Sequence, residues 1–284
     1  MKAKKSLGQH FLRSERALEA IVDAGNLAPG DTILEIGPGE GVLTERLLAC
    51  GSQVVAVEKD EELCGLLKQR FAEEISLGKL VLIHEDILNF EFSDYKLPTT
   101  HYKLIANIPY NITGAIFKKF LSTEYQPETM VLLVQKEVAK RILAQGSKPL
   151  DSARGKESIL SISVKAYGNP RYVETVKAGS FAPMPKVDSA ILAVEGISRD
   201  FFQKMAQVSH LEAELPSVEK RFFEILRAGF GSKRKKLSSN LSKLYPKSRV
   251  LEVFENLAMD ENTRAEDVSI ETWGQLAKRL ITNQ

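Results

Sequence analysis

The feature that most constrains this chain is a glycine-rich turn after a short hydrophobic run. Residues 32–36 are apolar and β-branched, which is typical of a buried parallel strand. Gly37, Gly39 and Gly41 follow at alternate positions, and helical spacing resumes at Val42. Glycine permits a sharp turn and lets the backbone approach a ligand closely, while a helix start offers unpaired N–H groups. This pattern predicts a nucleotide-type cofactor site at the first strand of an α/β sheet; the alternative is a tight turn that binds nothing.

The composition is that of a globular protein with one large core and room for a smaller domain. The chain has 284 residues, of which 43% are hydrophobic, and no apolar run is long enough to span a membrane. The lysine-rich start lacks the apolar segment of a signal peptide. Cys50 and Cys64 show neither metal-ligand spacing nor a disulfide framework. We therefore expect a cytoplasmic protein that binds no metal and no membrane.

Two further strands each end near an acidic side chain. Residues 53–58 end at Glu58, about twenty residues beyond the glycines, where a carboxylate accepts hydrogen bonds from ribose hydroxyls. Residues 80–83 form the next strand, and Asp86 beyond it is suited to accept a hydrogen bond from the exocyclic amine of a cofactor adenine. Each acid alone is more simply a solvated charge at a strand end. Together with the glycines, the two acids favour a cofactor pocket.

The fourth strand, residues 102–106, runs into Asn107, Ile108, Pro109 and Tyr110. Methylating the amino group of adenine requires acceptors for its N–H groups, because the nitrogen lone pair is delocalised into the ring. The Asn107 side-chain oxygen and a neighbouring carbonyl are suitable acceptors. Pro109 stiffens the loop, and Tyr110 is suited to stack on the base and to favour positive charge on the amine. The alternative is an ordinary turn at a strand end.

Three less specific features complete this half of the chain. Residues 1–31 precede the first strand and are long enough to fold back over a pocket; within them, His10 is either a catalyst or, more simply, a packing or capping residue. Residues 146–156 are polar and basic, which indicates an exposed loop. Phe181 stands on a proline-stiffened loop. It is suited to the second face of a splayed-out base or, alternatively, to the core.

Beyond residue 200, helical spacing replaces the strand pattern and the charge becomes uneven. Residues 201–250 contain eleven Lys and Arg against four Asp and Glu, while residues 251–284 contain three against seven. The densest basic cluster consists of Lys233, Arg234, Lys235 and Lys236. A short charge run is often only a solvated face. Set between hydrophobic helical segments, however, this cluster is suited to bind RNA phosphates.

Four motifs occur in order, at residues 8–12, 35–44, 107–112 and 181–189. Together they resemble the motifs of the ribosomal RNA adenine dimethyltransferases, and most closely those of the KsgA group that acts on small-subunit RNA. The resemblance favours base stacking by Phe181. The family often has Asn where His10 stands, which suits a backbone contact there better than a side-chain contact. The resemblance implies S-adenosylmethionine as methyl donor, in a site lined by His10, Leu12, Gly37, Gly39, Glu58, Asp86 and Asn107.

These observations together predict a two-domain enzyme. We expect an α/β, Rossmann-like class I methyltransferase sheet over residues 1–197 and a small all-helical RNA-binding domain over residues 198–284. We expect a monomer that transfers methyl groups from S-adenosylmethionine to adenine N6 in the 16S RNA of the small ribosomal subunit, dimethylating two adjacent adenosines. The expected catalytic residues are Asn107, Ile108, Pro109, Tyr110 and Phe181.

Three other functions share parts of this pattern. A large-subunit RNA methylase that confers drug resistance has a similar pocket, but Gly8 and the basic tail argue against it. An NAD-dependent dehydrogenase has the glycine turn and Glu58, but it does not explain residues 107–110; a cofactor-binding assay separates the two. A ribosome assembly factor that keeps the fold without activity fits every motif, and only an activity measurement excludes it.

Overall fold

A computed structural model describes residues 4, 7–95, 101–144, 156–208 and 215–282; the loop expected at 146–156 lies almost wholly outside them. The chain forms two compact units, residues 1–139 with 169–197 and residues 140–168 with 198–284. Residues 140–168, which the sequence places in the first domain, therefore group with the helices of the second unit. The reason is that helix α8 (Ile159–Tyr167) packs against helices α9 and α13 of that unit.

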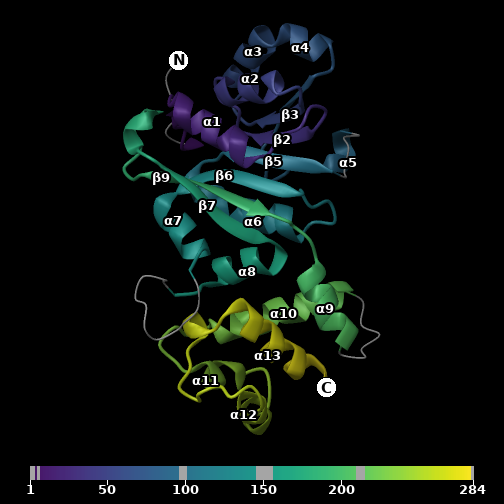
Figure 1. The fold of residues 1–284 in the computed structure, drawn as a ribbon, viewed down its shortest axis with the longest axis vertical. Coiled ribbons are helices and arrows are strands. Elements are labelled where there is room, and N and C mark those ends of the chain that lie inside the picture. The colour runs from purple at the N-terminus through teal and green to yellow at the C-terminus, as the bar shows by residue number, and fades with distance from the viewer. Residues whose placement is uncertain (1–3, 5–6, 96–100, 145–155, 209–214, 283–284) are drawn as a thin grey trace. The chain divides into compact units, whose positions relative to one another are not determined.

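A seven-stranded sheet forms the centre of the first unit, in the order β4-β3-β2-β5-β6-β9-β7 (Figure 1). Strands β4, β3, β2, β5 and β6 run parallel, whereas β9 is antiparallel to both of its neighbours. The bounds are β2 Thr32–Ile36, β3 Gln53–Glu58, β4 Leu80–His84, β5 Tyr102–Asn107, β6 Thr129–Gln135, β7 Asn169–Val176 and β9 Ser189–Glu195.

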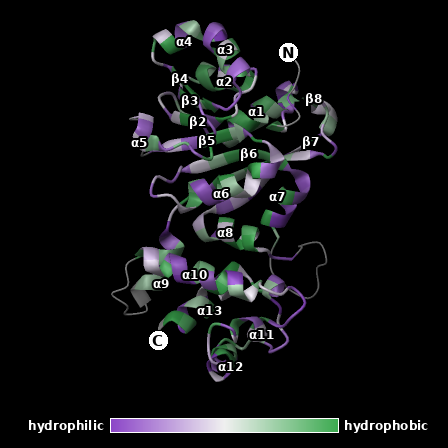
Figure 2. Ribbon diagram, turned by 180° about the vertical axis from the view of Figure 1, so that it is seen from behind, coloured by the Kyte–Doolittle hydropathy of each residue, from purple (hydrophilic) through white to green (hydrophobic). Residues whose placement is uncertain are grey.

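The inner strands are apolar on both faces. In β2, the neighbouring residues Ile33 and Leu34 point to opposite faces, and both are almost fully buried. Strand β6 is hydrophobic along most of its length (Figure 2). A parallel sheet that is covered on both sides requires such continuous apolar runs instead of alternation. This is why the short runs in the sequence predict these strands well.

Three helices contribute leucines to a core cluster on the sheet, among them Leu18, Leu47 and Leu67. The side chain of Ser14 caps the first of these helices, and that of Asp60 caps the third. The helices of this unit are α1 Glu15–Ala24, α2 Val42–Ala49, α3 Glu61–Arg70, α4 Ala72–Ser76, α5 Phe92–Tyr95, η2 Tyr110–Ile112, α6 Thr113–Ser122 and η3 Ala178–Ser180, with α7 Lys136–Ile142 crossing into the second unit.

A second, two-stranded sheet joins distant parts of the first unit. Strand β1 (Phe11–Leu12) pairs antiparallel with β8 (Phe181–Ala182), so that Leu12 lies opposite Phe181. The backbone N–H of Arg13 also donates to the carbonyl of Ser180 at 2.8 Å. These bonds fix the start of the chain against the segment that leads into β9.

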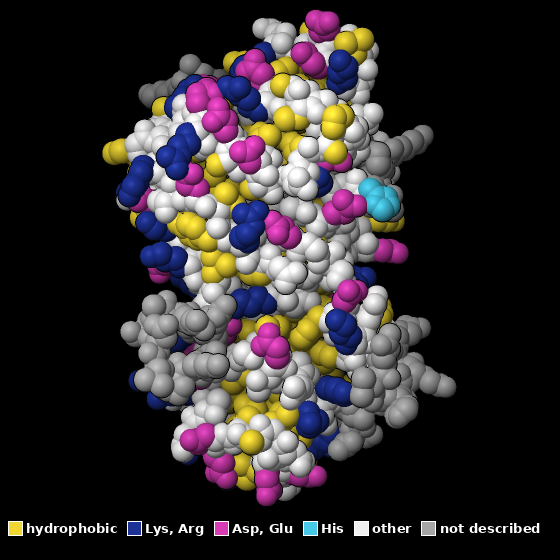
Figure 3. Space-filling model, viewed as in Figure 1, with side chains coloured by type: hydrophobic (Ala, Val, Ile, Leu, Met, Phe, Trp, Pro, Cys, Tyr) yellow, Lys and Arg dark blue, Asp and Glu magenta, His cyan; other side chains and the backbone are white. Residues whose placement is uncertain are grey.

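The second unit is built from helices around an aromatic core. Phe202, Phe222 and Trp273 are fully buried, and Phe202 makes ring contacts with Phe222 and Tyr167. No helix in the described ranges is both long and apolar enough to cross a membrane. On the face drawn in Figure 3, acidic and basic side chains are interspersed. Besides α8, the helices are α9 Asp200–Val208, α10 Leu215–Gly229, α11 Leu237–Leu241, α12 Lys247–Asn256, η4 Ala265–Asp267 and α13 Ile270–Thr282.

Candidate cofactor pocket and active site

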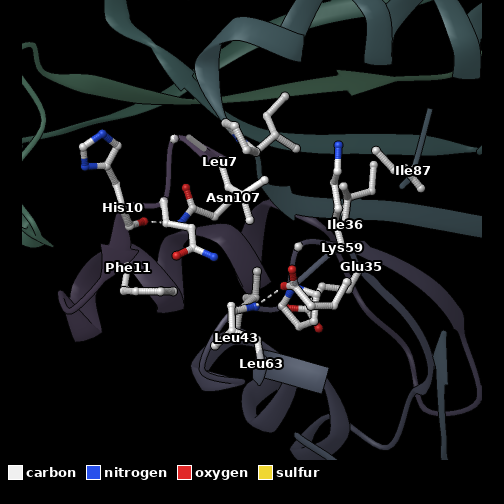
Figure 4. Close-up of a pocket in the computed structure, with 18 of the residues that line it drawn as sticks. Leu7, His10, Phe11, Glu35, Ile36, Leu43, Lys59, Leu63, Ile87 and Asn107 are labelled. Carbon is white, nitrogen blue, oxygen red and sulfur yellow. Dashed lines mark hydrogen bonds between the residues drawn. The ribbon is translucent and has the colours of Figure 1, made fainter. Parts of the chain in front are cut away.

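A pocket lies in the first unit, where the loops after β2, β3, β4 and β5 meet at one edge of the sheet (Figure 4). The chain crosses over between β4 and β5, so the pocket occupies the switch point of the strand order, where such folds bind ligands. Its lining includes His10, Leu12, Gly37, Gly39, Glu58, Asp86, Asn107, Ile108, Pro109 and Tyr110. All seven residues expected at the cofactor are therefore brought together.

The three glycines of the turn share one backbone conformation but differ in what surrounds them. Gly37, Gly39 and Gly41 all have left-handed backbone angles, with φ of 64°, 61° and 83°, which other residues rarely adopt. At Gly37 a Cβ would meet nothing within 4 Å, at Gly39 it would lie 3.1 Å from the ring of Phe11, and at Gly41 it would lie 2.5 Å from Phe71. Gly37 and Gly39 line the pocket, whereas Gly41 serves packing.

Glu58 ends β3 and points into the pocket. It is 6% exposed, and its two carboxylate oxygens accept from the backbone N–H of Gly39 at 3.1 Å and of Asp60 at 2.8 Å. Burial raises the pKa of Glu58, against the opposing effect of these two hydrogen bonds. Each oxygen retains a second lone pair that can accept a ligand hydroxyl.

Asp86 lies just beyond β4, in contact with a lysine that the sequence did not single out. The Lys59 ammonium lies 2.7 Å from Oδ2 of Asp86, and Oδ1 accepts from the backbone N–H of Leu88 at 3.0 Å. The hydrogen bond from Lys59 lowers the pKa of Asp86. Asp86 is therefore an ionised acceptor, and Lys59 forms part of the same wall of the pocket.

Glu35 is a second functional group that sequence reasoning missed. This carboxyl is buried in the middle of β2 and also lines the pocket. It accepts from the Thr44 hydroxyl at 2.7 Å. Burial raises its pKa to about 8, and the charge of Glu58 adds to the effect. Glu35 therefore holds a proton at neutral pH. In the sequence, the sign of an unusual role is an acidic residue inside an otherwise apolar run.

The start of the chain forms one wall of the pocket and is tied down by Asp60. The Asp60 carboxylate accepts from Lys4 Nζ at 2.8 Å and from Gln9 Nε2 at 2.9 Å. Burial acts to raise the pKa of Asp60, but these bonds lower it below its usual value. Because the backbone N–H of Asp60 also donates to Glu58, Asp60 holds both the start of the chain and the Glu58 side chain in place. The expectation that residues 1–31 fold back over the pocket holds for the described part.

Asn107 and His10 are linked through the backbone of His10. Nδ2 of Asn107 donates to the His10 carbonyl at 3.1 Å (Figure 4). The donor half of the amide is therefore engaged, and its oxygen is left to accept from a ligand. The His10 side chain turns away and bonds through Nδ1 to the carbonyl of Pro183 at 2.7 Å. Because a carbonyl only accepts, Nδ1 carries the proton.

Tyr110 lies at the pocket beside His10, at the start of η2. The two rings are stacked, with centroids 6.0 Å apart and an interplanar angle of 21°. The Tyr110 hydroxyl lies 2.6 Å from Oγ of Ser189. Burial raises the pKa of Tyr110, so the phenol is neutral. Ile108 is buried beneath this loop, and Pro109 precedes the short helix as its cap residue.

Phe181 is not part of the pocket lining. It is 5% exposed and belongs to the core cluster that also contains Leu12, Leu18 and Val176. Its pairing opposite Leu12 in the β1–β8 sheet draws the ring into this core. This buried position matches the core interpretation that the sequence offers, and the base-stacking role stays a prediction.

The basic cluster Lys233, Arg234, Lys235 and Lys236 lies in the second unit. All four side chains are exposed, on the turn between α10 and α11. The Asn240 side chain donates to the carbonyls of Gly229 at 2.7 Å and Ser232 at 3.0 Å. Asn240 thereby fixes the turn on which the cluster is displayed. Nowhere in the described ranges do three or more His, Cys, Asp or Glu side chains gather as a metal site would require.

The strand order, the glycine turn and the pocket define the fold of a class I methyltransferase. Two solved structures with this fold extend over nearly the whole chain. The 23S rRNA methyltransferase ErmE has a TM-score of 0.71 and 26% identity, covering 95% of this chain and 99% of its own. A dimethyladenosine transferase from Plasmodium falciparum has a TM-score of 0.73 and 25% identity, covering 94% and 96%.

Sequence comparison narrows the class to one family. The chain belongs to the ribosomal RNA adenine dimethylase family, whose sequence model matches residues 1–282. Among its relatives, a ribosomal RNA small subunit methyltransferase A from Dehalococcoides mccartyi is 39% identical over 100% of this chain and 90% of its own length. A protein of the same name from Nostoc punctiforme is 37% identical over 99% and 96%.

Proposed function

We propose that this protein transfers methyl groups from S-adenosylmethionine to the N6 amines of two adjacent adenosines in small-subunit ribosomal RNA, and that it acts in the cytoplasm as a monomer. The observation that carries the proposal is the orientation of Asn107. The His10 carbonyl holds the Asn107 N–H group, which leaves the amide oxygen as an acceptor at the pocket. The lone pair of the adenine amino nitrogen is delocalised into the ring. An acceptor for the N–H groups of that nitrogen is needed to concentrate electron density on it.

The pocket suits a cationic nucleoside cofactor. Besides the protonated Glu35, its lining carries the carboxyl groups of Glu40, Glu58, Glu85 and Asp86 and one ammonium group, that of Lys59. This surplus of acids favours a positively charged ligand. We assign the ribose hydroxyls to Glu58 and the adenine amine to Asp86. When bound, S-adenosylmethionine supplies an electrophilic methyl group on a positively charged sulfur.

The chain's own residues contribute positioning and electrostatics. The Asn107 oxygen accepts a hydrogen bond from the reacting amine and so directs its lone pair toward the methyl donor. Tyr110 offers a ring on which the base stacks, a contact worth about 1–3 kcal/mol, and its electron-rich face favours positive charge at the amine. Alignment of two reactants in this way supplies much of the rate enhancement in a simple displacement.

One observation supports the small subunit as the substrate. The relatives from Dehalococcoides and Nostoc are named for the small subunit and align over nearly the full chain. The solved neighbours include a 23S rRNA methyltransferase, so the fold by itself does not separate the two subunits. We assign phosphate contacts to the basic cluster, because lysine and arginine side chains displayed on a surface bind the RNA backbone.

The test is methyl transfer to purified ribosomal subunits. Unmethylated small and large subunits are incubated separately with the protein and radiolabelled S-adenosylmethionine, and the modified bases are mapped. We expect dimethyladenosine at two adjacent positions of the small-subunit RNA, and Asn107→Ala serves as the inactive control. Label in the large-subunit RNA alone would identify a large-subunit methylase, and cofactor binding without transfer would identify an assembly factor.

A further inference from the structure

Ser189 is a buried hydroxyl that the proposed chemistry does not use. It is fully buried at the first position of β9, where it pairs with Gln135 of β6 on one side and Val176 of β7 on the other. Its Oγ lies 2.6 Å from the Tyr110 hydroxyl. Backbone that is paired with a strand on each side has little freedom to move. The Tyr110 hydroxyl is therefore bonded to a residue of a strand that is paired on both sides.

The segment before Ser189 is also tied to the sheet. The backbone N–H of Lys136 donates to the Asp188 carbonyl at 3.1 Å. The Asp188 carboxylate accepts from the backbone N–H of Ala178 at 3.1 Å and forms an ion pair with Lys177 at 3.0 Å. These bonds fix the backbone on the N-terminal side of Ser189, so its hydroxyl has a fixed position from which to hold Tyr110.

The backbone of Tyr110 is bonded to the start of α6, because its carbonyl accepts from the backbone N–H and from the hydroxyl of Thr113. Tyr110 follows Pro109 and begins a helical turn of only three residues. One contact of its ring is the stack with His10, whose own side chain is held by the carbonyl of Pro183. Pro183 and Ser189 belong to the same segment of the chain. Pro183 holds the His10 ring, and Ser189 holds the Tyr110 ring. Without the Ser189 bond, the Tyr110 ring could rotate about its side-chain torsions.

We propose that Ser189 is a positioning residue for methyl transfer, which sets the orientation of the Tyr110 ring against the target adenine. This inference rests on the proposed function, because it requires a base that stacks on Tyr110. The hydroxyl of Tyr110 then serves as a tether and takes no proton, in keeping with a neutral phenol bonded to a neutral serine. Ser189 is not among the residues that line the cofactor pocket, so it acts through Tyr110.

The test is a double-mutant cycle. Ser189→Ala, Tyr110→Phe and the double variant are compared in single-turnover methyl transfer to unmethylated small subunits, with saturating S-adenosylmethionine. We expect each single variant to be about tenfold slower, which corresponds to about 1.4 kcal/mol, and the double variant to be no slower than either one. Affinity for S-adenosylmethionine, measured by calorimetry, should stay unchanged, since a general loss of structure would weaken it.

Two matched controls isolate the tether. Tyr102→Phe removes a phenol hydroxyl that bonds the carbonyl of Tyr125 instead. Ser52→Ala removes a buried serine oxygen for which the described part of the chain offers no partner. Both should keep the wild-type rate.

A double variant that multiplies the two single effects would overturn the proposal, as would a wild-type rate in Tyr110→Phe. If Ser189→Ala fails to fold, the Tyr110→Phe rate decides alone, because that change leaves the sheet intact. Failure of the wild-type protein to methylate any subunit is a different result, which refutes the proposed function and is seen before any variant is made.

Discussion

Replacing Glu58 with Gln tests the assignment of the cofactor ribose. In the structure, each Glu58 oxygen accepts one backbone N–H, from Gly39 or from Asp60, so ribose hydroxyls must use the remaining lone pairs. Gln offers one oxygen and one NH₂ group. The NH₂ group faces a backbone donor and cannot accept from the ribose, so one charge-assisted hydrogen bond to the cofactor disappears together with the negative charge.

The expected weakening follows from that count. A hydrogen bond to a charged group contributes about 1.5–3 kcal/mol, and about 1.4 kcal/mol corresponds to a factor of ten. The Kd for S-adenosylmethionine should therefore rise roughly 10- to 150-fold. Isothermal titration calorimetry measures it directly, and thermal unfolding verifies that the variant is folded. Glu61→Gln is the matched control, because Glu61 lies at the same helix start with an exposed side chain.

The same variant makes a prediction about pH. Burial raises the pKa of Glu58 above its ordinary value, so wild-type affinity should weaken as the pH falls through that raised pKa and the carboxylate gains a proton. Glu58→Gln has no proton to gain at this site and should lack that weakening. A folded variant whose Kd stays within about threefold of wild type, a change of less than about 0.7 kcal/mol, would refute the ribose assignment.

Three further perturbations test other parts of the molecule. Phe181→Ala should lower the free energy of unfolding by about 3–5 kcal/mol through the cavity it leaves, measured by urea denaturation; slower methyl transfer at unchanged stability would instead support base stacking. Replacing the four residues of the basic cluster with Ala should flatten the salt dependence of subunit binding by about 0.7–0.9 log units of slope for each RNA phosphate that is no longer neutralised, with S-adenosylmethionine affinity unchanged, and an unaltered slope would make the cluster a solvated face. Because burial raises the pKa of Glu35 to about 8, the unfolded chain ionises first, and wild-type stability should fall as pH rises toward that value. Glu35→Gln should remove this part of the fall in thermal unfolding experiments, and a wild-type profile would show that Glu35 titrates normally.

The local sequence pattern is sufficient to predict the strands whose following loops line the pocket. The apolar runs at residues 32–36 and 53–58 became β2 and β3 with the same bounds, because an inner parallel strand is short, apolar and followed by a turn. Asn107 was placed at the pocket for the same reason, since parallel strands end at one edge of the sheet. The glycines were sufficient for the turn but did not show that Gly41 faces Phe71 and not the pocket.

The remainder depended on contacts between distant residues. Two-residue strands such as β1 and β8 have no periodicity to detect, and their pairing is what takes Phe181 into the core. The edge strand β7 begins with Asn169, Pro170 and Arg171 and lacks an apolar run. The bonds from Asp60 to Lys4 and Gln9 join side chains more than fifty positions apart, and no local pattern specifies such a bond.

The pairing of β1 with β8 has a consequence for the order in which the molecule becomes functional. The strand at residues 11–12 leaves the ribosome early in synthesis, but its partner at residues 181–182 emerges only after the inner parallel strands have been made. Contacts so far apart in sequence form slowly, because a long loop must close first. Until β8 appears, the start of the chain has Asp60 and Asn107 to bond to at the pocket, and the β1–β8 pairing is added to these bonds last. The pocket wall therefore gains this backbone anchor late in synthesis.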